Sequence, residues 1–421
     1  MPVHTEKDFK GRHRYTQEGE LMMKRKTLTI LLLTTLVLSV FAAIPVNAAD
    51  PDLKIVVQLK GGLEAGQQLV QAMEDISNAE WAVVFDDLMA SDLSDADMLI
   101  LIQSDMAVNY TTAEKSAVKS WFMTPGKTLW ICSDSDFSDQ YLRIPTANDM
   151  LEYLDSKLRA ESVESADPNG AEGADYRVLG QSYNVDPEFK FLVDGVTQAL
   201  FHGPGLIYGY LGGVGYKLEE VSLDGVYVIM TTTPEGIAVD FEPPVPEVHE
   251  VGYEGNLTLL ALEKLANGNS LYVGADAPFA HYTPMYRPEI VKWERYGVLH
   301  PQQGGKLFEN IVNYAIRTKL TAEITGLDND VSALGSEKAA LESQVSTLEG
   351  EKSSLEDDVA DLESGVATLE SDVATLETSV TDLEADVTAA KSSASTWQMY
   401  AIGALVIGLA LGFFVGPMIR K

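Results

Sequence analysis

The chain has 421 residues, of which 46% are hydrophobic and 8% are aromatic. This composition excludes an intrinsically disordered chain and leaves enough length for a large core with extensions. The formal net charge of −33 argues against nucleic acid as a partner, because phosphate binding needs clustered lysine and arginine. The single cysteine, Cys132, excludes an intrachain disulfide and a cysteine zinc site.

Residues 1–49 contain a polar extension followed by a predicted secretory signal peptide. The basic stretch at 24–26 precedes an apolar run at 28–43, and small residues follow. Basic, apolar and cleavage regions in this order are typical of a secretory signal. We expect cleavage near Ala48 or Ala49, with an uncleaved signal anchor as the alternative, and a start at Met22 or Met23.

The head, residues 50–318, begins with alternating strands and helices. Thr111 or Thr112 caps the second helix, with Glu114 in its first turn. Such βαβ alternation predicts an α/β fold of the Rossmann or flavodoxin type with a mostly parallel sheet. The predicted strands are 53–59, 81–85, 98–102 and 127–132, and the predicted helices are 63–76 and 112–122.

The second half of the head is richer in strands, and a closing helix at 307–316 leads towards the C-terminal third. Turn-forming residues are concentrated at 161–175 and at 233–249. We expect the first of these segments to be flexible and the second to be an extended surface arm. The predicted strands of this half are 197–201, 225–231 and 270–273.

The segment 319–391 carries about ten uninterrupted heptads, which predict a coiled-coil stalk. Valine or isoleucine at a with leucine at d favours a parallel homodimer, and Lys338 and Lys352 at a reinforce a low oligomer number. At about 1.5 Å per residue the rod is about 105 Å long. The d positions of the predicted dimer seam include Leu327, Leu341, Leu355, Leu369 and Leu383.

Acidic residues fill most of the e and g positions beside this seam. In a parallel homodimer Glu337 faces Glu342, and Glu351 faces Glu356. The like-charge pairs together cost about 3–5 kcal/mol at low salt, less than burial of the apolar seam contributes. A basic partner helix from another protein is the alternative to a homodimer.

An uncharged stretch at the C-terminus predicts a single transmembrane helix over 397–419. Trp397 and Tyr400 lie where an interfacial aromatic belt is expected, and the basic tail at 420–421 places the C-terminus in the cytoplasm. We therefore expect an extracellular head on a single-pass cell-membrane protein.

Small residues spaced four apart, including Gly408 and Gly412, extend the dimer seam into the membrane segment. Such spacing lets two membrane helices approach closely. Glycine is also common in membrane helices that do not pair.

Acidic residues cluster where two predicted strands end. Asp134, Asp136 and Asp139 follow the strand 127–132, and Asp276 follows the strand 270–273. Because ligands of open α/β sheets bind at the carboxyl ends of strands, these carboxylates are candidate ligands for Ca²⁺ or Mg²⁺. The alternative is turn and helix-cap chemistry. No organic cofactor is predicted.

Cys132 is the candidate nucleophile, with His202 or His281 as its base. The alternative interpretation makes Cys132 a small buried core residue. His202 begins a His-Gly-Pro-Gly stretch that follows a predicted strand and is a candidate lining of the same cleft. The alternative is that its glycines serve the turn alone.

Asn109 and Asn256 lie in Asn-x-Thr sequons. If the head is secreted, both are candidate glycosylation sites.

Three motifs carry a resemblance to a known family: GKTLWICSDSDF at 126–137, NGNSLYVGADAPF at 267–279 and GGKLFENIVNYAI at 304–316. Residues 50–318 resemble the class I glutamine-amidotransferase-like fold. Those enzymes carry a Gly-x-Cys-x-Gly nucleophile elbow, whereas Cys132 lies between Ile131 and Ser133. The resemblance therefore implies a non-catalytic relative. The signal, stalk and anchor together resemble archaeal cell-envelope proteins.

The sequence thus favours a non-enzymatic binding or scaffold domain displayed outside the cell on a dimeric stalk. The expected partners are the membrane, a second copy of the chain and an envelope or surface-layer protein. A tethered hydrolase or amidotransferase relative, and a solute-capture subunit of a transporter, are the alternatives.

Overall fold

The computed structural model describes residues 52–85, 87–104, 108–171, 173–182, 185–279, 285–286 and 302–415. The predicted signal peptide, His281 and the basic tail at 420–421 lie outside these residues. The chain divides into two compact units, one up to Leu327 and one from Asp328 onwards.

The head is built on a nine-stranded mixed sheet in the order β2-β1-β3-β4-β15-β14-β11-β7-β8. Neighbours from β2 to β15 pair in parallel, and those from β15 to β8 pair antiparallel. The predicted α/β fold with mostly parallel core strands is confirmed. The strands are β1 (Leu53–Lys60), β2 (Ala79–Phe85), β3 (Met98–Gln103), β4 (Thr128–Cys132), β7 (Arg177–Gln181), β8 (Gln198–His202), β11 (Val226–Thr231), β14 (Thr258–Lys264) and β15 (Ser270–Gly274).

Short helices connect the parallel strands. The helix α3 begins with a complete capping box, in which Thr111 Oγ1 accepts from the Glu114 amide and the Glu114 carboxylate accepts from the Thr111 amide. Thr111, rather than Thr112, is therefore the N-cap. The helices are α2 (Gln67–Asp75), α3 (Thr112–Phe122) and α4 (Arg143–Tyr153), with 3₁₀ turns η1 (Ser138–Leu142) and η2 (Lys190–Val193).

The head also contains two small antiparallel sheets, and two strands of one of them, β6 and β12, lie in the segments predicted to be flexible or extended. Glu164–Ala166 is a buried strand within the supposedly flexible stretch, and His249 is fully buried at the end of the supposed surface arm. The first prediction was wrong because non-local strand pairing overrides local composition. The second was wrong at both ends, where β12 (Gly236–Val239) and the buried His249 lie, but residues 240–245 between them are exposed and irregular. The sheets are β10-β9-β5 and β13-β12-β6, formed by β5 (Leu158–Glu161), β6 (Glu164–Ala166), β9 (Leu206–Leu211), β10 (Val214–Tyr216), β12 (Gly236–Val239) and β13 (Glu254–Gly255).

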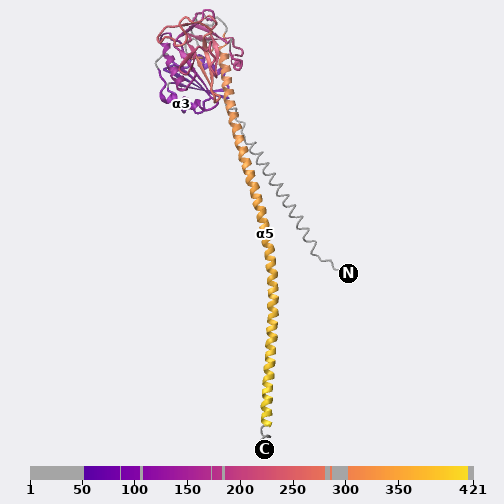
Figure 1. Ribbon diagram of the computed structural model, residues 1–421. Helices are drawn as coiled ribbons and strands as arrows, with labels where there is room; N and C mark the ends of the chain where they lie inside the picture. The colour runs from indigo at the N-terminus through magenta and orange to yellow at the C-terminus, as the bar shows by residue number, and fades with distance from the viewer. Residues whose placement is uncertain are drawn as a thin grey trace. The chain divides into compact units, whose positions relative to one another are not determined.

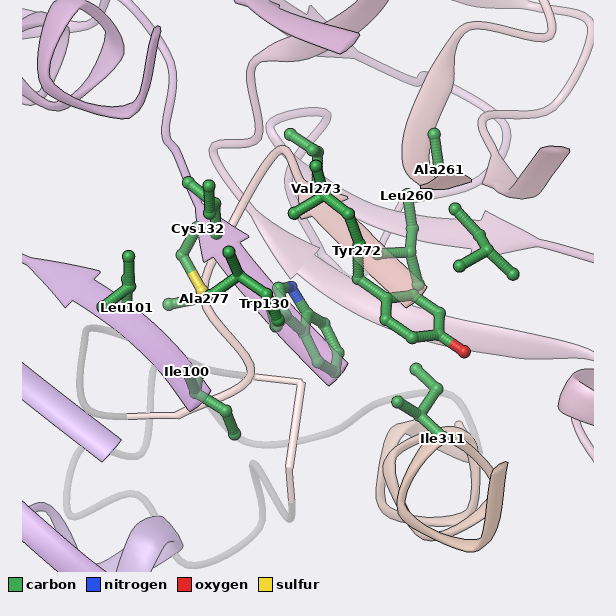
Figure 2. Packing of buried hydrophobic residues seen from close by; sticks show 14 of the residues in the cluster. Ile100, Leu101, Trp130, Cys132, Leu260, Ala261, Tyr272, Val273, Ala277 and Ile311 are labelled. Atoms are coloured by element: carbon green, nitrogen blue, oxygen red, sulfur yellow. The ribbon is translucent and has the colours of Figure 1, made fainter. Parts of the chain in front are cut away.

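The last helix, α5, runs from Gly304 to Val415 (Figure 1). Its first turns belong to the head and bury Phe308 and Ile311. The Phe308 ring stacks on Trp130 and Trp81, with ring centroids 5.9 and 6.3 Å apart. Figure 2 shows Ile311 beside the core that Trp130 and Tyr272 form with their neighbours.

Candidate functional site

The carboxyl ends of β4 and β15 lie side by side, with Cys132 paired to Gly274. The Asp134 carboxylate that follows β4 accepts from Arg143 Nη1 at 2.6 Å, and both side chains are only 2% exposed. The Asp276 carboxylate that follows β15 accepts from the amides of His202 at 2.8 Å and Ala277 at 2.6 Å. Asp134 and Asp276 therefore both lie at this edge of the sheet.

A turn after β8 covers the same edge. The Gly205 amide donates to the Ala275 carbonyl at 3.1 Å, and the Pro204 carbonyl accepts from Ser165 N at 2.7 Å. A Cβ on Gly205 would lie 2.4 Å from the Asp134 carbonyl oxygen, so only glycine allows this approach. Open α/β sheets bind ligands at such edges, but here the position is filled by the protein itself.

Cys132 lies inside the core, among side chains that include Leu101, Trp130 and Ala277 (Figure 2). Burial raises the pKa of its thiol well above the ordinary value, and the charge of Asp276 adds to the effect. A nucleophilic cysteine needs the opposite, a lowered pKa and access to substrate. These surroundings match the interpretation of Cys132 as a core residue.

His202 is held by its backbone and by an aromatic neighbour. Its amide donates to Asp276, and its ring packs edge-on against Tyr176 with centroids 5.5 Å apart. The other candidate base, His281, lies outside the described residues.

Three of the four acidic candidates accept separate hydrogen bonds, and the fourth, Asp139, is exposed. Asp136 accepts from the amides of Phe241 and Glu242, and burial raises its pKa. Asp139 is exposed on η1. Within the described ranges, no three histidine, cysteine or acidic side chains are grouped to hold a metal ion. In this structure Asp134, Asp136 and Asp276 accept hydrogen bonds that fix turns.

A buried ion pair that the sequence did not reveal joins β1 to α3. Lys60 Nζ lies 2.8 and 3.0 Å from the two carboxylate oxygens of Glu114 and 2.7 Å from Asp87 Oδ1. Burial alone would lower the pKa of Lys60, but the two carboxylates raise it. For Glu114, burial would raise the pKa, but the Lys60 ammonium and the donors around the carboxylate lower it. In the sequence, the feature that pointed to this ion pair was a lysine at the end of an apolar strand.

His249 forms a second buried cluster that sequence reasoning missed. Its Nδ1 contacts Glu161 Oε2, and its Nε2 lies 2.7 Å from Glu219 Oε1. Burial would lower the pKa of His249, but the two glutamates raise it to about 9. The protonated His249 side chain links the segment after β12 to β5. The proline-rich sequence around His249 gave no indication of this role.

A groove of about 1140 Å³ lies beside α3 on the head. Small side chains of α3, including Ala113 and Ala117, form one wall, and Met89 and Leu93 form the other. Met89 is exposed. The sequence gave no indication of this groove, because its walls come from segments that are not adjacent in sequence.

The two sequons differ in accessibility. Asn109 is exposed directly before the N-cap region that Thr111 forms. Asn256 is half-buried, its Nδ2 donates to the Thr232 carbonyl at 3.1 Å, and Thr258 of the same sequon is fully buried in β14. Of these two asparagines, Asn109 is thus the accessible one in the folded head.

The second unit is the remainder of α5. Its leucines and valines at the predicted a and d positions, from Val331 to Val387, are 50–70% exposed in the single chain. Gly408 and Gly412 lie on the same helix. One helix among the described residues is long and apolar enough to cross a membrane, and it is α5.

No family model matches the chain, and no curated protein matches it. Similar solved structures include the mmIFT52 N-terminal domain (9% identity, TM-score 0.41, covering 62% of this chain and 96% of that one). A putative GMP synthase component from Thermoplasma acidophilum is 11% identical, with a TM-score of 0.33, covering 65% and 97%. PurLQS from Thermotoga maritima is 14% identical, with a TM-score of 0.27, covering 62% and 98%.

Proposed function

We propose that the chain is a membrane-anchored extracellular surface protein, in which two parallel copies pair along α5 and display non-enzymatic α/β heads. The observation that carries this proposal is the apolar seam, whose side chains from Leu320 to Val387 are 48–70% exposed in one chain. A soluble helix does not keep so long an apolar stripe in water without a partner.

The energetics favour pairing of two copies. Each seam side chain contributes on the order of 1.5 kcal/mol or more when buried. The like-charged e and g rows oppose pairing by only about 3–5 kcal/mol in total. Pairing is therefore favourable at low salt, and salt or divalent cations such as Ca²⁺ or Mg²⁺ strengthen it by screening the carboxylates.

The features of the head support a binding or scaffold role over catalysis. The sheet edge where enzymes of this architecture hold substrate is occupied by the turn at Gly205. The Cys132 thiol is buried with a raised pKa. The alternative of a tethered hydrolase or amidotransferase relative has less support for these reasons.

The proposed orientation rests on the two ends of the chain. The predicted signal peptide directs the head outside, and the basic tail at 420–421 keeps the C-terminus in the cytoplasm. The resemblance to archaeal envelope proteins favours an envelope or surface-layer partner for the head.

Light scattering of the full-length protein in detergent tests the proposal. The wild-type chain is expected to have the mass of two copies, and the double variant Leu355→Asp/Leu369→Asp the mass of one. The control, Ser354→Asp/Thr368→Asp, adds the same charges away from the seam and is expected to stay paired. A wild-type chain with the mass of one copy would overturn the proposal.

A solute-capture role is the second candidate, and the groove beside α3 favours it. Mass spectrometry of small molecules released from the natively purified protein tests this role. A compound that the wild type releases, and that an Ala117→Trp variant with a filled groove lacks, would support it. Equal profiles for the two proteins would count against it.

A further inference from the structure

The basic residues of the stalk are placed in an unusual way. From 328 to 390 the sequence contains only two, Lys338 and Lys352, and both occupy a positions of the heptad repeat. Lysines that served only solubility would lie on the outer face of the helix. These two lysines lie instead in the apolar stripe that the proposed pairing buries. Lys352 lies two heptads after Lys338.

The surroundings of the two lysines repeat each other. Lys338 Nζ lies 2.8 Å from Glu342 Oε1, and Lys352 Nζ lies 2.7 Å from Glu356 Oε1. A glutamate at g, Glu337 or Glu351, directly precedes each lysine. Each ammonium therefore has an acidic neighbour at the following e position of its own helix, and a glutamate at g precedes it.

The first of these lysines borders a shallow, open hollow on the exposed face of the helix. The hollow measures about 550 Å³ and is lined by Leu334, Glu337, Lys338, Leu341, Glu342 and Val345. Coiled coils pair by inserting a side chain of one helix into such a hole, formed by neighbouring a, d and g residues of the other. The hollow is thus where a second helix is expected to dock.

We infer that Lys338 and Lys352 fix the parallel, in-register alignment of a second copy of this chain on α5. This inference rests on the proposed pairing. In the aligned dimer the a residue of one copy packs beside the a residue and the preceding g residue of the other. Lys338 then meets Glu337 of the second copy, and Lys352 meets Glu351. Each layer holds one lysine and two glutamates from each copy.

Other parallel alignments lose part of these contacts. A slip of one heptad sets Lys338 of one copy against Val345, which Gln344 precedes in place of a glutamate. That ammonium is then buried in an apolar layer with fewer carboxylates around it. A slip of two heptads sets Lys338 of one copy against Lys352 of the other, and leaves the remaining lysine of each copy opposite a valine or an isoleucine.

An antiparallel pair sets a residues against d residues. Each lysine then lies against a leucine of the other copy, and no longer against the lysine and the g glutamate that the parallel alignment sets beside it. Polar a residues fix register and orientation in this way at a cost in stability.

Disulfide trapping in the full-length protein in detergent tests the inference. Leu376→Cys at d in both copies cross-links only in register. In a mixture of Leu376→Cys and Leu383→Cys chains, a tag distinguishes the two kinds of chain. A cross-link between a Leu376→Cys chain and a Leu383→Cys chain forms only after a one-heptad slip. The wild-type lysines are expected to favour the in-register product. Lys338→Val/Lys352→Val is expected to melt at a higher temperature and to reduce that preference at least about tenfold.

Two controls accompany the trapping experiment. Lys338→Arg/Lys352→Arg keeps the charges and is expected to keep the preference, and Lys391→Val removes a lysine outside the a positions and is expected to change nothing. An unchanged preference in the double valine variant would overturn the inference while leaving the pairing intact. If no reporter forms a cross-linked dimer, the pairing itself is refuted, and the inference with it.

Discussion

Lys60 Nζ lies 2.8 Å from Glu114 Oε1, although the two side chains are only 6% and 1% exposed. The pair links the carboxyl end of β1 to the first turn of α3. Gln58 Nε2 and the Leu88 amide also donate to the same carboxylate oxygen, at 3.0 and 3.1 Å. One buried carboxylate therefore organises three segments of the head.

Replacing this carboxylate is expected to be costly. Glu114→Gln keeps the shape of the side chain but leaves the Lys60 ammonium buried with Asp87 as its carboxylate partner. Removing one member of a buried ion pair costs about 3–5 kcal/mol. Urea unfolding followed by tryptophan fluorescence should show a lower midpoint. Asp155→Asn removes the exposed pair with Lys119 and should leave the midpoint in place; equal midpoints for all three proteins would contradict the prediction.

The His249 cluster predicts a pH-dependent stability. The folded pKa of about 9 lies above the ordinary value of about 6.5, so the folded head binds the proton more tightly than the unfolded chain. The stabilisation is complete below about pH 6.5 and disappears as the pH rises through about 9, with a magnitude on the order of 3 kcal/mol.

Urea unfolding at a series of pH values checks this dependence of the free energy of unfolding on pH. His249→Gln removes the titrating group, and its loss of stability across the same range should be smaller than that of the wild type. Parallel pH profiles for the two proteins would show that His249 does not carry the effect.

Cys132 is expected to be unreactive in the native protein. The residue is 3% exposed and the pKa of its thiol is raised, so an aqueous thiol reagent has access to neither the sulfur nor a thiolate. Because the chain has one cysteine, a simple absorbance assay suffices. The native protein should remain unlabelled, and the urea-unfolded protein should react completely. Rapid labelling without urea would mean that the edge of the sheet opens.

The acidic e and g rows predict that salt stabilises the stalk. The Debye length falls from about 10 Å at 0.1 M salt to about 3 Å at 1 M, which weakens the repulsion between Glu337 and Glu342 of the two copies. Circular dichroism of the full-length protein should show a melting temperature that rises with salt. Glu363→Gln/Glu377→Gln, at e positions that follow a valine and not a lysine at a, should reduce the dependence. A melting temperature unaffected by salt would refute the like-charge pairing.

The parallel half of the sheet was predictable because its strands are apolar runs bounded by turn residues. The strands at 53–59 and 98–102 were found within a residue of their bounds. Glu164–Ala166 could not be found, because what makes it a strand is its pairing with β12, far along the chain. Composition indicates only the local preference of a segment for helix or strand. A short buried strand among proline, glycine and aspartate residues has no local preference for strand.

The candidate site also has a part that the sequence predicted and a part that it did not. The position of Asp134 and Asp276 beyond strand ends followed from the order of elements. The Arg143 partner of Asp134, and the turn at Gly205 that covers both, depend on contacts between distant segments. Sequence spacing can place residues at an edge, but it cannot tell whether that edge is open or filled.

The position of Cys132 bears on how two copies are held together. Because the single cysteine of the chain is buried inside the head, oxidants have no accessible thiol through which to couple neighbouring chains. The proposed assembly is therefore non-covalent. It should separate on dilution or in strong detergent, and reducing agents should leave it unchanged.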